Sequence, residues 1–351
     1  MNFTFSDDQT MMADAARQIL TDACTSQRLR TQMAQGAARD EVRWAALAEN
    51  GLTAVLAPES VGGLGLEAPD FVRIAEAAGY VALPEPLVEH AGVALPLLAA
   101  AALDHPWLPE AVEGGRTLAI GHPVNPFVAD ADTAGALLLP DGDAVHLLSS
   151  DQVQKTRQES IDPFRRLFRL NWTPSHATRI ADGEEGAALW RAALDRGALF
   201  SAAQCLGLAQ RSVDLAVAYA QERQQFGKPI GAYQAVKHHL ASAQVKIEFA
   251  RPVVHAASAV VSHDTLQSRA RVSHAKIVAA EAADFAARTA IQVHGAMGYS
   301  WEVEVHLFLK RALALTYAWG DPTLHQRRIQ ARIFGAPVGA DHTFSHEATH
   351  G

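Results

Sequence analysis

Cysteine is scarce in this sequence of 351 residues, in which Cys24 and Cys205 are the only two. Two cysteines exclude a disulfide framework and a cysteine-based metal site, and such usage is typical of a reducing compartment. Long apolar runs are also missing, since none reaches the ~18 residues that span a bilayer, and the first residues lack the basic and apolar stretches of a secretory signal. We therefore expect a cytoplasmic protein without a membrane partner.

Clusters of positive charge are absent as well. The chain has 30 lysines and arginines against 38 aspartates and glutamates, which gives a formal net charge of −8. Binding to a phosphate backbone needs gathered cations, so we exclude nucleic acid as a partner. The composition is otherwise that of an ordinary folded protein, with 49% hydrophobic and 19% charged residues, and the length suffices for two or three packed domains.

Helix-forming alanine and leucine dominate the first part of the chain. Ser6, followed by Asp7 and Asp8, predicts a helix N-cap with acidic residues in the first turn. One proline and three glycines within residues 57–66 interrupt the helical pattern, so we expect a loop there, either a plain connector or one that faces a ligand. The sequence predicts an N-terminal helical domain over residues 1–115.

The pattern changes between residues 116 and 183, where we predict a small middle β domain. An apolar run on each side of the tight turn Asp141-Gly142 predicts a β-hairpin. A further half-buried strand is indicated by apolar side chains that alternate with polar ones, namely Phe168, Leu170 and Trp172. A sheet domain of this size must bury its apolar side chains against its neighbours.

Helical spacing returns after Gly183 and predicts a C-terminal four-helix bundle over residues 184–335. Small and apolar residues recur three and four positions apart in four stretches, roughly 195–224, 233–261, 272–293 and 302–317. Pro252 predicts a kink in the second of these helices. Residues 336–351 are rich in glycine, alanine, histidine and proline, and we expect them to be disordered.

Four-helix bundles also hold di-iron centres, which need Glu-x-x-His pairs that face inward from two helices. The chain has one such pair, Glu347 and His350, and it lies in the tail. We therefore expect no metal site, and we interpret the sixteen scattered histidines as mostly surface or structural residues.

Three stretches at the breaks between the bundle helices resemble the signature stretches of the acyl-CoA dehydrogenase family. In chain order they are Gly207-Leu-Ala-Gln-Arg211, then Glu222-Arg-Gln-Gln-Phe-Gly-Lys-Pro-Ile230 with Tyr233-Gln234, and finally Gln292-Val-His-Gly-Ala-Met-Gly-Tyr-Ser-Trp-Glu302. The resemblance covers residues 195–333 well and the N-terminal helices more loosely, and the β segment matches only in position and hairpin character. It implies a mostly α protein with a small β domain, arranged as in acyl-CoA dehydrogenases.

The resemblance also implies FAD as a cofactor. Arg223 would contact its diphosphate, with Phe226 beside it, since a guanidinium group binds phosphate in a fixed geometry. Gln234 opens a helix whose N–H groups favour anions, and glycines let a cofactor approach the backbone closely. The candidate cofactor-binding residues are therefore Arg223, Phe226, Gln234, Gln292, Gly295 and Gly298.

In the family these arginine and glycine stretches come from different subunits, so the resemblance implies a homo- or hetero-oligomer. A plainer interpretation stays open, in which Gly295 and Gly298 are helix C-caps and Arg223 forms a surface ion pair.

The family chemistry is α,β-dehydrogenation of an acyl-CoA thioester, in which a carboxylate takes the α-proton and flavin takes the β-hydride. An electron-transfer flavoprotein-like acceptor would then reoxidise the flavin. This sequence departs from the family at the base, because Trp319 occupies the usual glutamate position and Gly197 occupies a second family position. Neither residue can act as a base, and Asp321 is the nearest carboxylate.

A second departure lies in the β domain, where residues 121–126 lack the flavin-facing pattern of the family. Together with the short chain, this resembles the shortened subunits of bacterial heteromeric acyl-CoA dehydrogenases, which act on bulky acyl groups including steroid side-chain thioesters. Two hypotheses stay open. The chain is an active FAD enzyme that uses Asp321 or an unrecognised acid, or it is a non-catalytic partner subunit that completes the FAD site and the assembly.

Overall fold

The computed structural model describes residues 4–36 and 39–339. Its N-terminal part is helical, as predicted, and α1 begins at Ser6, whose side chain accepts a hydrogen bond of 3.1 Å from the Gln9 N–H. The helices of this part are α1 (Asp7–Ala23), α2 (Ser26–Gln35), α3 (Glu41–Glu49), α4 (Ala68–Tyr80), α5 (Leu87–Glu89), α6 (Leu95–Ala101) and α7 (Trp107–Val112).

Two small sheets follow, and they include the predicted hairpin. In the first sheet, with the order β1-β3-β4-β7, β3 and β4 pair antiparallel around the turn at Gly142, which has a φ of +57°. Its strands are β1 (Leu118–Ile120), β3 (Ala136–Asp141), β4 (Ala144–Ser149) and β7 (Arg179–Ala181). The second sheet contains β2 (Val128–Ala129), β6 (Leu167–Asn171) and β5 (Gln154–Gln158), and β6 confirms the strand predicted from alternation.

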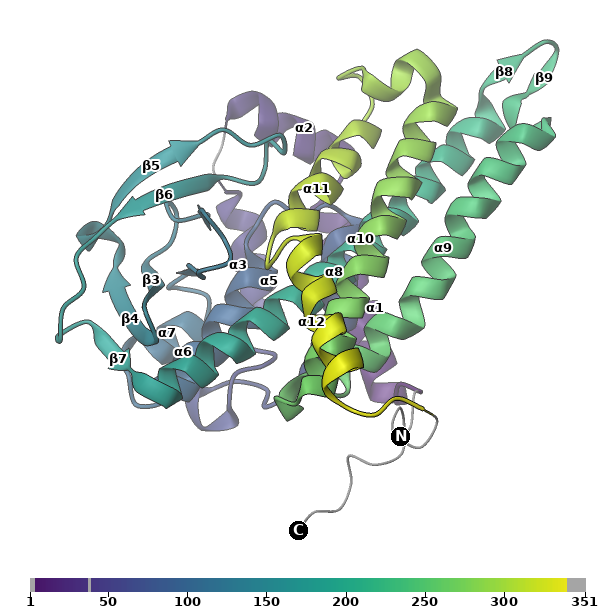
Figure 1. Cartoon of the computed structure of the whole chain (residues 1–351). Helices are drawn as coiled ribbons and strands as arrows, with labels where there is room; N and C mark the ends of the chain where they lie inside the picture. The colour runs from purple at the N-terminus through teal and green to yellow at the C-terminus, as the bar shows by residue number, and fades with distance from the viewer. Residues whose placement is uncertain (1–3, 37–38, 340–351) are drawn as a thin grey trace.

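The C-terminal part is a helical bundle, and the predicted fold class is confirmed. Its helices are α8 (Gly183–Glu222), α9 (Gln234–Ser258), α10 (Leu266–His294), α11 (Val305–Tyr317) and α12 (Pro322–Gly335). Figure 1 shows α12 alongside α10, following the end of α11. The sequence pattern missed α12 because His325 is its single buried residue, so no apolar stripe marks it. Of the predicted disordered tail, residues 340–351 lie outside the described residues.

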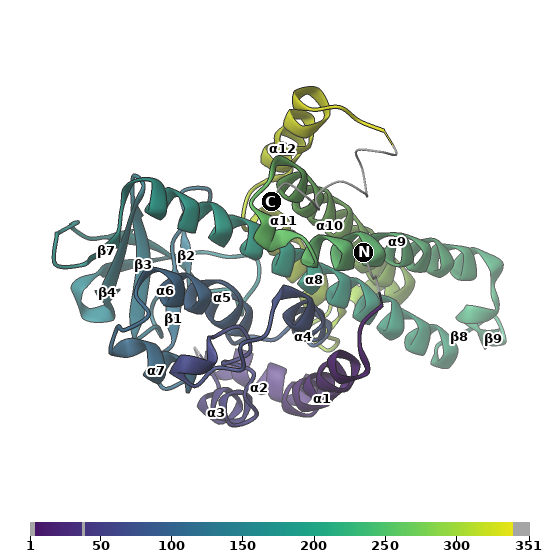
Figure 2. The same ribbon diagram turned by 90° about the horizontal axis from the view of Figure 1, so that it is seen from below.

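Helix α8 extends much further toward the sheets than predicted, beginning at Gly183 instead of near Asp195. Over its 40 residues it runs from the sheets to the far end of the bundle (Figures 1 and 2). Its middle is buried almost all round. The sequence pattern located residues 195–222 and missed residues 183–194, most of whose side chains are exposed or half-buried, so that no continuous apolar stripe marks them.

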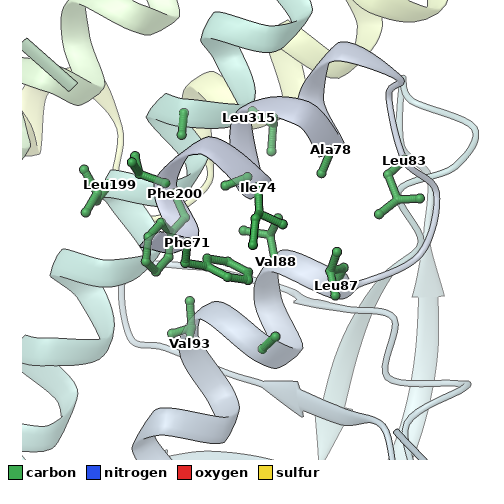
Figure 3. Packing of buried hydrophobic residues seen from close by; sticks show 14 of the residues in the cluster. Phe71, Ile74, Ala78, Leu83, Leu87, Val88, Val93, Leu199, Phe200 and Leu315 are labelled. Carbon is green, nitrogen blue, oxygen red and sulfur yellow. The ribbon is translucent and has the colours of Figure 1, made fainter. Parts of the chain in front are cut away.

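Helices α4 and α8 approach one another so closely that only glycine fits at the crossing. A Cβ atom on Gly207 would lie 2.9 Å from the carbonyl carbon of Gly79, and one on Gly79 would lie 2.6 Å from the Cα atom of Gln204. Beside this crossing, the rings of Phe71 and Phe200 meet edge to face with their centroids 4.9 Å apart (Figure 3). Gly207, which opens the first signature stretch, thus has a packing role.

An ion network joins the N-terminal helices, the sheets and the bundle. The buried Arg311 of α11 forms an ion pair with Asp162 and donates a hydrogen bond of 2.9 Å to the Leu83 carbonyl oxygen. Nearby, Arg165 pairs with Glu89 at 3.3 Å. A buried charge whose partner is removed becomes strongly destabilising, so these pairs fix how the three parts meet.

The crossing predicts that Gly207→Ala destabilises the protein. The added methyl group has no room between two backbones, and overpacking of this kind costs about 1–3 kcal/mol. Urea unfolding followed by circular dichroism measures the change. Gly115→Ala is the control, because a Cβ atom there would first meet the Glu110 Cγ atom at 3.4 Å, an ordinary contact. Equal stability of the two variants would refute the close crossing.

Candidate functional site

The predicted FAD-binding arginine lies where α8 ends. Arg223 caps the helix, with its N–H bonded to the Tyr219 carbonyl oxygen at 2.8 Å, and the short strands β8 (Gln224–Gln225) and β9 (Lys228–Pro229) form a hairpin beyond it. Figure 1 shows this hairpin extending past the end of the bundle. Phe226 lies at its tip with a φ of +53° and is 92% exposed. Its ring is therefore accessible to another molecule.

Gln234 is the first residue of α9, directly after the hairpin. The preceding Tyr233 braces the hairpin, because its hydroxyl donates to the Gln225 carbonyl oxygen at 3.2 Å and its ring lies 4.3 Å from the Lys228 ammonium. No side chain caps the first N–H groups of α9. These N–H groups and the helix dipole therefore favour an anion at this end.

The third predicted stretch follows the end of α10. Gln292 lies in its last turn and Gly295 caps it with a φ of +60°, a conformation that favours glycine. Gly298 is buried, and a Cβ atom on it would lie 2.6 Å from the Ile291 carbonyl oxygen. Backbone conformation and close packing thus explain why glycine stands at both positions. The exposed Tyr299 and Trp301 follow them in the chain. FAD binding by these residues stays a prediction.

One aromatic stack brings the arginine and glycine stretches to the same end of the bundle. The Tyr219 ring of α8 stacks on the His294 ring of α10 with their centroids 4.3 Å apart. Burial lowers the pKa of His294, so this imidazole is uncharged at neutral pH. In addition, Arg211 of the first signature stretch pairs with Glu304 at 2.9 Å, a link for which the sequence gave no signal.

Trp319 and Gly197, the residues predicted to occupy the base positions of the family, touch each other. Trp319, in the turn between α11 and α12, is only 3% exposed, and its ring fills the space beside Gly197 of α8. A Cβ atom on Gly197 would lie 2.5 Å from the Trp319 Cε2 atom. The contact contains no carboxylate, so neither position supplies a proton acceptor.

Uncharged aromatic and imidazole rings surround this contact. The His122 ring lies 5.8 Å from the Trp319 ring and 5.7 Å from the Trp190 ring, centroid to centroid. Burial lowers the pKa values of His122 and His325 to about 4, so both are neutral near pH 7.

Two carboxylates near this turn, Asp321 and Asp195, are held by other groups. Asp321 is exposed and caps α12, where its Oδ1 atom accepts a hydrogen bond of 2.7 Å from the Leu324 N–H. Asp195, a buried acid that sequence reasoning missed, is paired with Arg328, and burial raises the pKa of its carboxyl. The role of Asp321 as a base stays a prediction.

A cavity of about 470 Å³ lies between the sheet loops and α11, next to the Trp319 turn. Phe127, Ile161, Leu167, Leu313 and Tyr317 give it a mostly apolar lining, to which Arg165 contributes a cation and Glu159 a carboxylate. A mostly apolar cleft with a few charged groups is typical of a ligand site.

Two further features of the described residues bear on function. No group of three or more histidine, cysteine, aspartate and glutamate side chains gathers there in a way that could hold a metal ion. Among the same residues, no helix combines the length and the apolar character needed to cross a membrane.

Two family models match the chain. The model described as "Acyl-CoA dehydrogenase, C-terminal domain" matches residues 184–334, and that described as "Acyl-CoA dehydrogenase, N-terminal domain" matches residues 6–115. The acyl-CoA dehydrogenase IpdE2 of Mycolicibacterium smegmatis is 31% identical over 332 residues, which cover 94% of this chain and 100% of that relative.

Solved structures agree with these matches. A chain of the ChsE4-ChsE5 complex from Mycobacterium tuberculosis is 25% identical with a TM-score of 0.84, covering 96% of this chain and 100% of that one. The steroid acyl-CoA dehydrogenase Tcur3481-Tcur3483 is 26% identical with a TM-score of 0.81, covering 93% of this chain and 98% of that one. The resemblance carried by the three signature stretches is thus confirmed, and the chain belongs to the acyl-CoA dehydrogenase family.

Proposed function

We propose that this chain is one subunit of a heteromeric acyl-CoA dehydrogenase, in which it helps to complete an FAD site while a partner subunit supplies the catalytic base. The observation that carries this proposal is the contact between Trp319 and Gly197, which leaves both family base positions without a carboxylate. The solved relatives support it, since one is by its title a complex of two proteins, ChsE4 and ChsE5.

The residues at the hairpin end fit the FAD that the family implies. The guanidinium of Arg223 and the uncapped first turn of α9 both favour a diphosphate. A Cβ atom on Gly295 would meet nothing within 4 Å, so the backbone there is open to a cofactor that, as in the family, is shared with another subunit. Gln234 and Gln292 offer amide groups for the adenine or ribose. Phe226, which is almost fully exposed, would pack against the cofactor or the partner.

When bound, FAD supplies the acceptor for the hydride that leaves the β-carbon of the acyl thioester. The residues of this chain would bind and orient the cofactor. Arg223 would hold the diphosphate, and the apolar cavity beside α11 would exclude water from a flat ring. Removal of the α-proton needs a carboxylate within hydrogen-bond reach, which we assign to the partner.

The substrate and the setting follow from the relatives and the composition. We infer a bulky acyl-CoA thioester, with a steroid side chain as one candidate, because a similar structure is by its title a steroid acyl-CoA dehydrogenase. An electron-transfer flavoprotein-like acceptor would take the electrons. Cys24 and Cys205 are buried free thiols, which supports a reducing, cytoplasmic setting.

The alternative is that this chain is an active enzyme with Asp321 as its base. The carboxylate of Asp321 is exposed and engaged with the Leu324 N–H, whereas a catalytic base must face the α-carbon of a bound acyl group. Its place at the α12 N-cap therefore favours a structural role.

Arg223→Ala should lower the FAD content of the assembled complex without unfolding the chain. Loss of a charge-assisted contact to phosphate costs about 1.5–3 kcal/mol, or roughly ten- to a hundredfold in affinity. Flavin absorbance after dialysis measures the loss. Arg17→Ala, an exposed arginine on α1, is the matched control. Full flavin content in the Arg223 variant would show that this residue does not hold the diphosphate.

Asp321→Asn tests whether Asp321 is the catalytic base. Asparagine caps helices about as well as aspartate, so the fold should survive. We expect turnover of the assembled complex to stay within a few-fold of wild type. A catalytic base contributes ~10²–10⁴-fold, so a loss of that size with FAD still bound would assign the base to Asp321.

A further inference from the structure

The turn that carries Trp319 is held in a strained conformation by two hydrogen bonds. Trp319 has a φ of +60°, which is uncommon and strained for a residue with a side chain. Its N–H donates to the Asn125 Oδ1 atom at 2.8 Å, and its carbonyl oxygen accepts a hydrogen bond of 3.0 Å from the His325 Nε2 atom. These clamps come from the sheet domain and from α12.

The helix before the turn is anchored too. The Leu315 carbonyl oxygen, near the end of α11, accepts hydrogen bonds from the buried Lys276 ammonium and, at 3.3 Å, from the Ser201 hydroxyl. Lys276 also donates to Ser201 at 2.9 Å. The end of α11 is therefore fixed against α8 and α10.

The indole of Trp319 meets a matching gap in α8. Gly197 is the residue whose Cβ atom would overlap the ring, so the glycine forms a socket into which the indole fits. His122 lies on another side of the ring, and Trp190 lies beyond His122. A strained backbone persists only where its surroundings determine it, and here the clamps and the socket do so together.

We propose that Trp319 is a resident plug that closes the acyl-binding space of this subunit from the inside, with Gly197 as its socket and Asn125 and His325 as its clamps. The identification of this space as the acyl site rests on the proposed function. The assembly would then bind its acyl thioester in the space of the partner subunit, and this chain would contribute only to cofactor binding and assembly.

Trp319→Gly tests the plug on the isolated chain. Glycine accepts the positive φ, so the backbone strain falls while a cavity opens. Apolar cavities of about 150 Å³ in protein cores bind small aromatic molecules. The variant should melt below wild type, and indole at several times its dissociation constant should raise its melting temperature by about 2 °C or more. Indole should not change the melting temperature of the wild-type protein.

The double variant Gly197→Leu/Trp319→Gly is the matched control. The leucine refills the socket, so the response to indole should disappear. A folded Trp319→Gly protein that does not respond to indole would overturn the plug. If wild type were stabilised more by hexanoyl-CoA than by CoA, the acyl space would be open and the proposed closure would be wrong.

If Trp319→Gly does not fold, a second pair of variants tests whether the Trp319 ring occupies the space beside Gly197. Gly197→Ala should strongly destabilise the wild-type protein. The same substitution should only weakly destabilise the Trp319→Leu variant, because the smaller leucine leaves room for the added methyl group. Equal effects in both backgrounds would refute the socket. None of these measurements needs flavin or a partner, so they can fail or succeed independently of the proposed function.

Discussion

Close backbone approach along α8 positions every other part of this molecule. Three of its glycines each receive a different part of the chain. Gly186 lies against Asp143 in the turn of the β3–β4 hairpin, Gly207 lies against α4, and Gly197 receives the Trp319 ring. Because the helix is buried over its middle and runs the length of the fold, the sheets, the N-terminal helices and the α11–α12 turn are set relative to one another through it.

Two regions at different places along α8 differ in how accessible they are. The hairpin at the far end of α8 displays Arg223 and Phe226 to solvent, where another subunit or a cofactor can reach them. The interior space near Gly197, by contrast, is filled by an aromatic side chain whose backbone is held on both sides. Under the proposed function, the exposed hairpin would serve assembly and cofactor binding, while the Trp319–Gly197 contact would leave this chain without a base of its own.

The sequence predicted most of the fold, because regular spacing in α9 and α10 and the Asp141-Gly142 turn are local signals. It missed the first residues of α8, 183–194, which are mostly exposed or half-buried, and all of α12, whose single buried residue leaves no apolar stripe. For the site, it placed Trp319 and Gly197 at the base positions but not in contact, since their meeting depends on how two distant segments pack. The clamps Asn125 and His325 and the Asp195–Arg328 pair gave no sequence signal for the same reason.

The most direct test of whether a partner subunit supplies the base is the flavin absorbance of the purified chain. It is measured for the chain alone and after co-expression with a full-length acyl-CoA dehydrogenase subunit of the same organism. We expect the chain alone to be colourless. The complex should be yellow and should bleach when an acyl-CoA reduces it. A chain that is yellow by itself and bleaches with acyl-CoA in the absence of any partner would contradict the partner-supplied base.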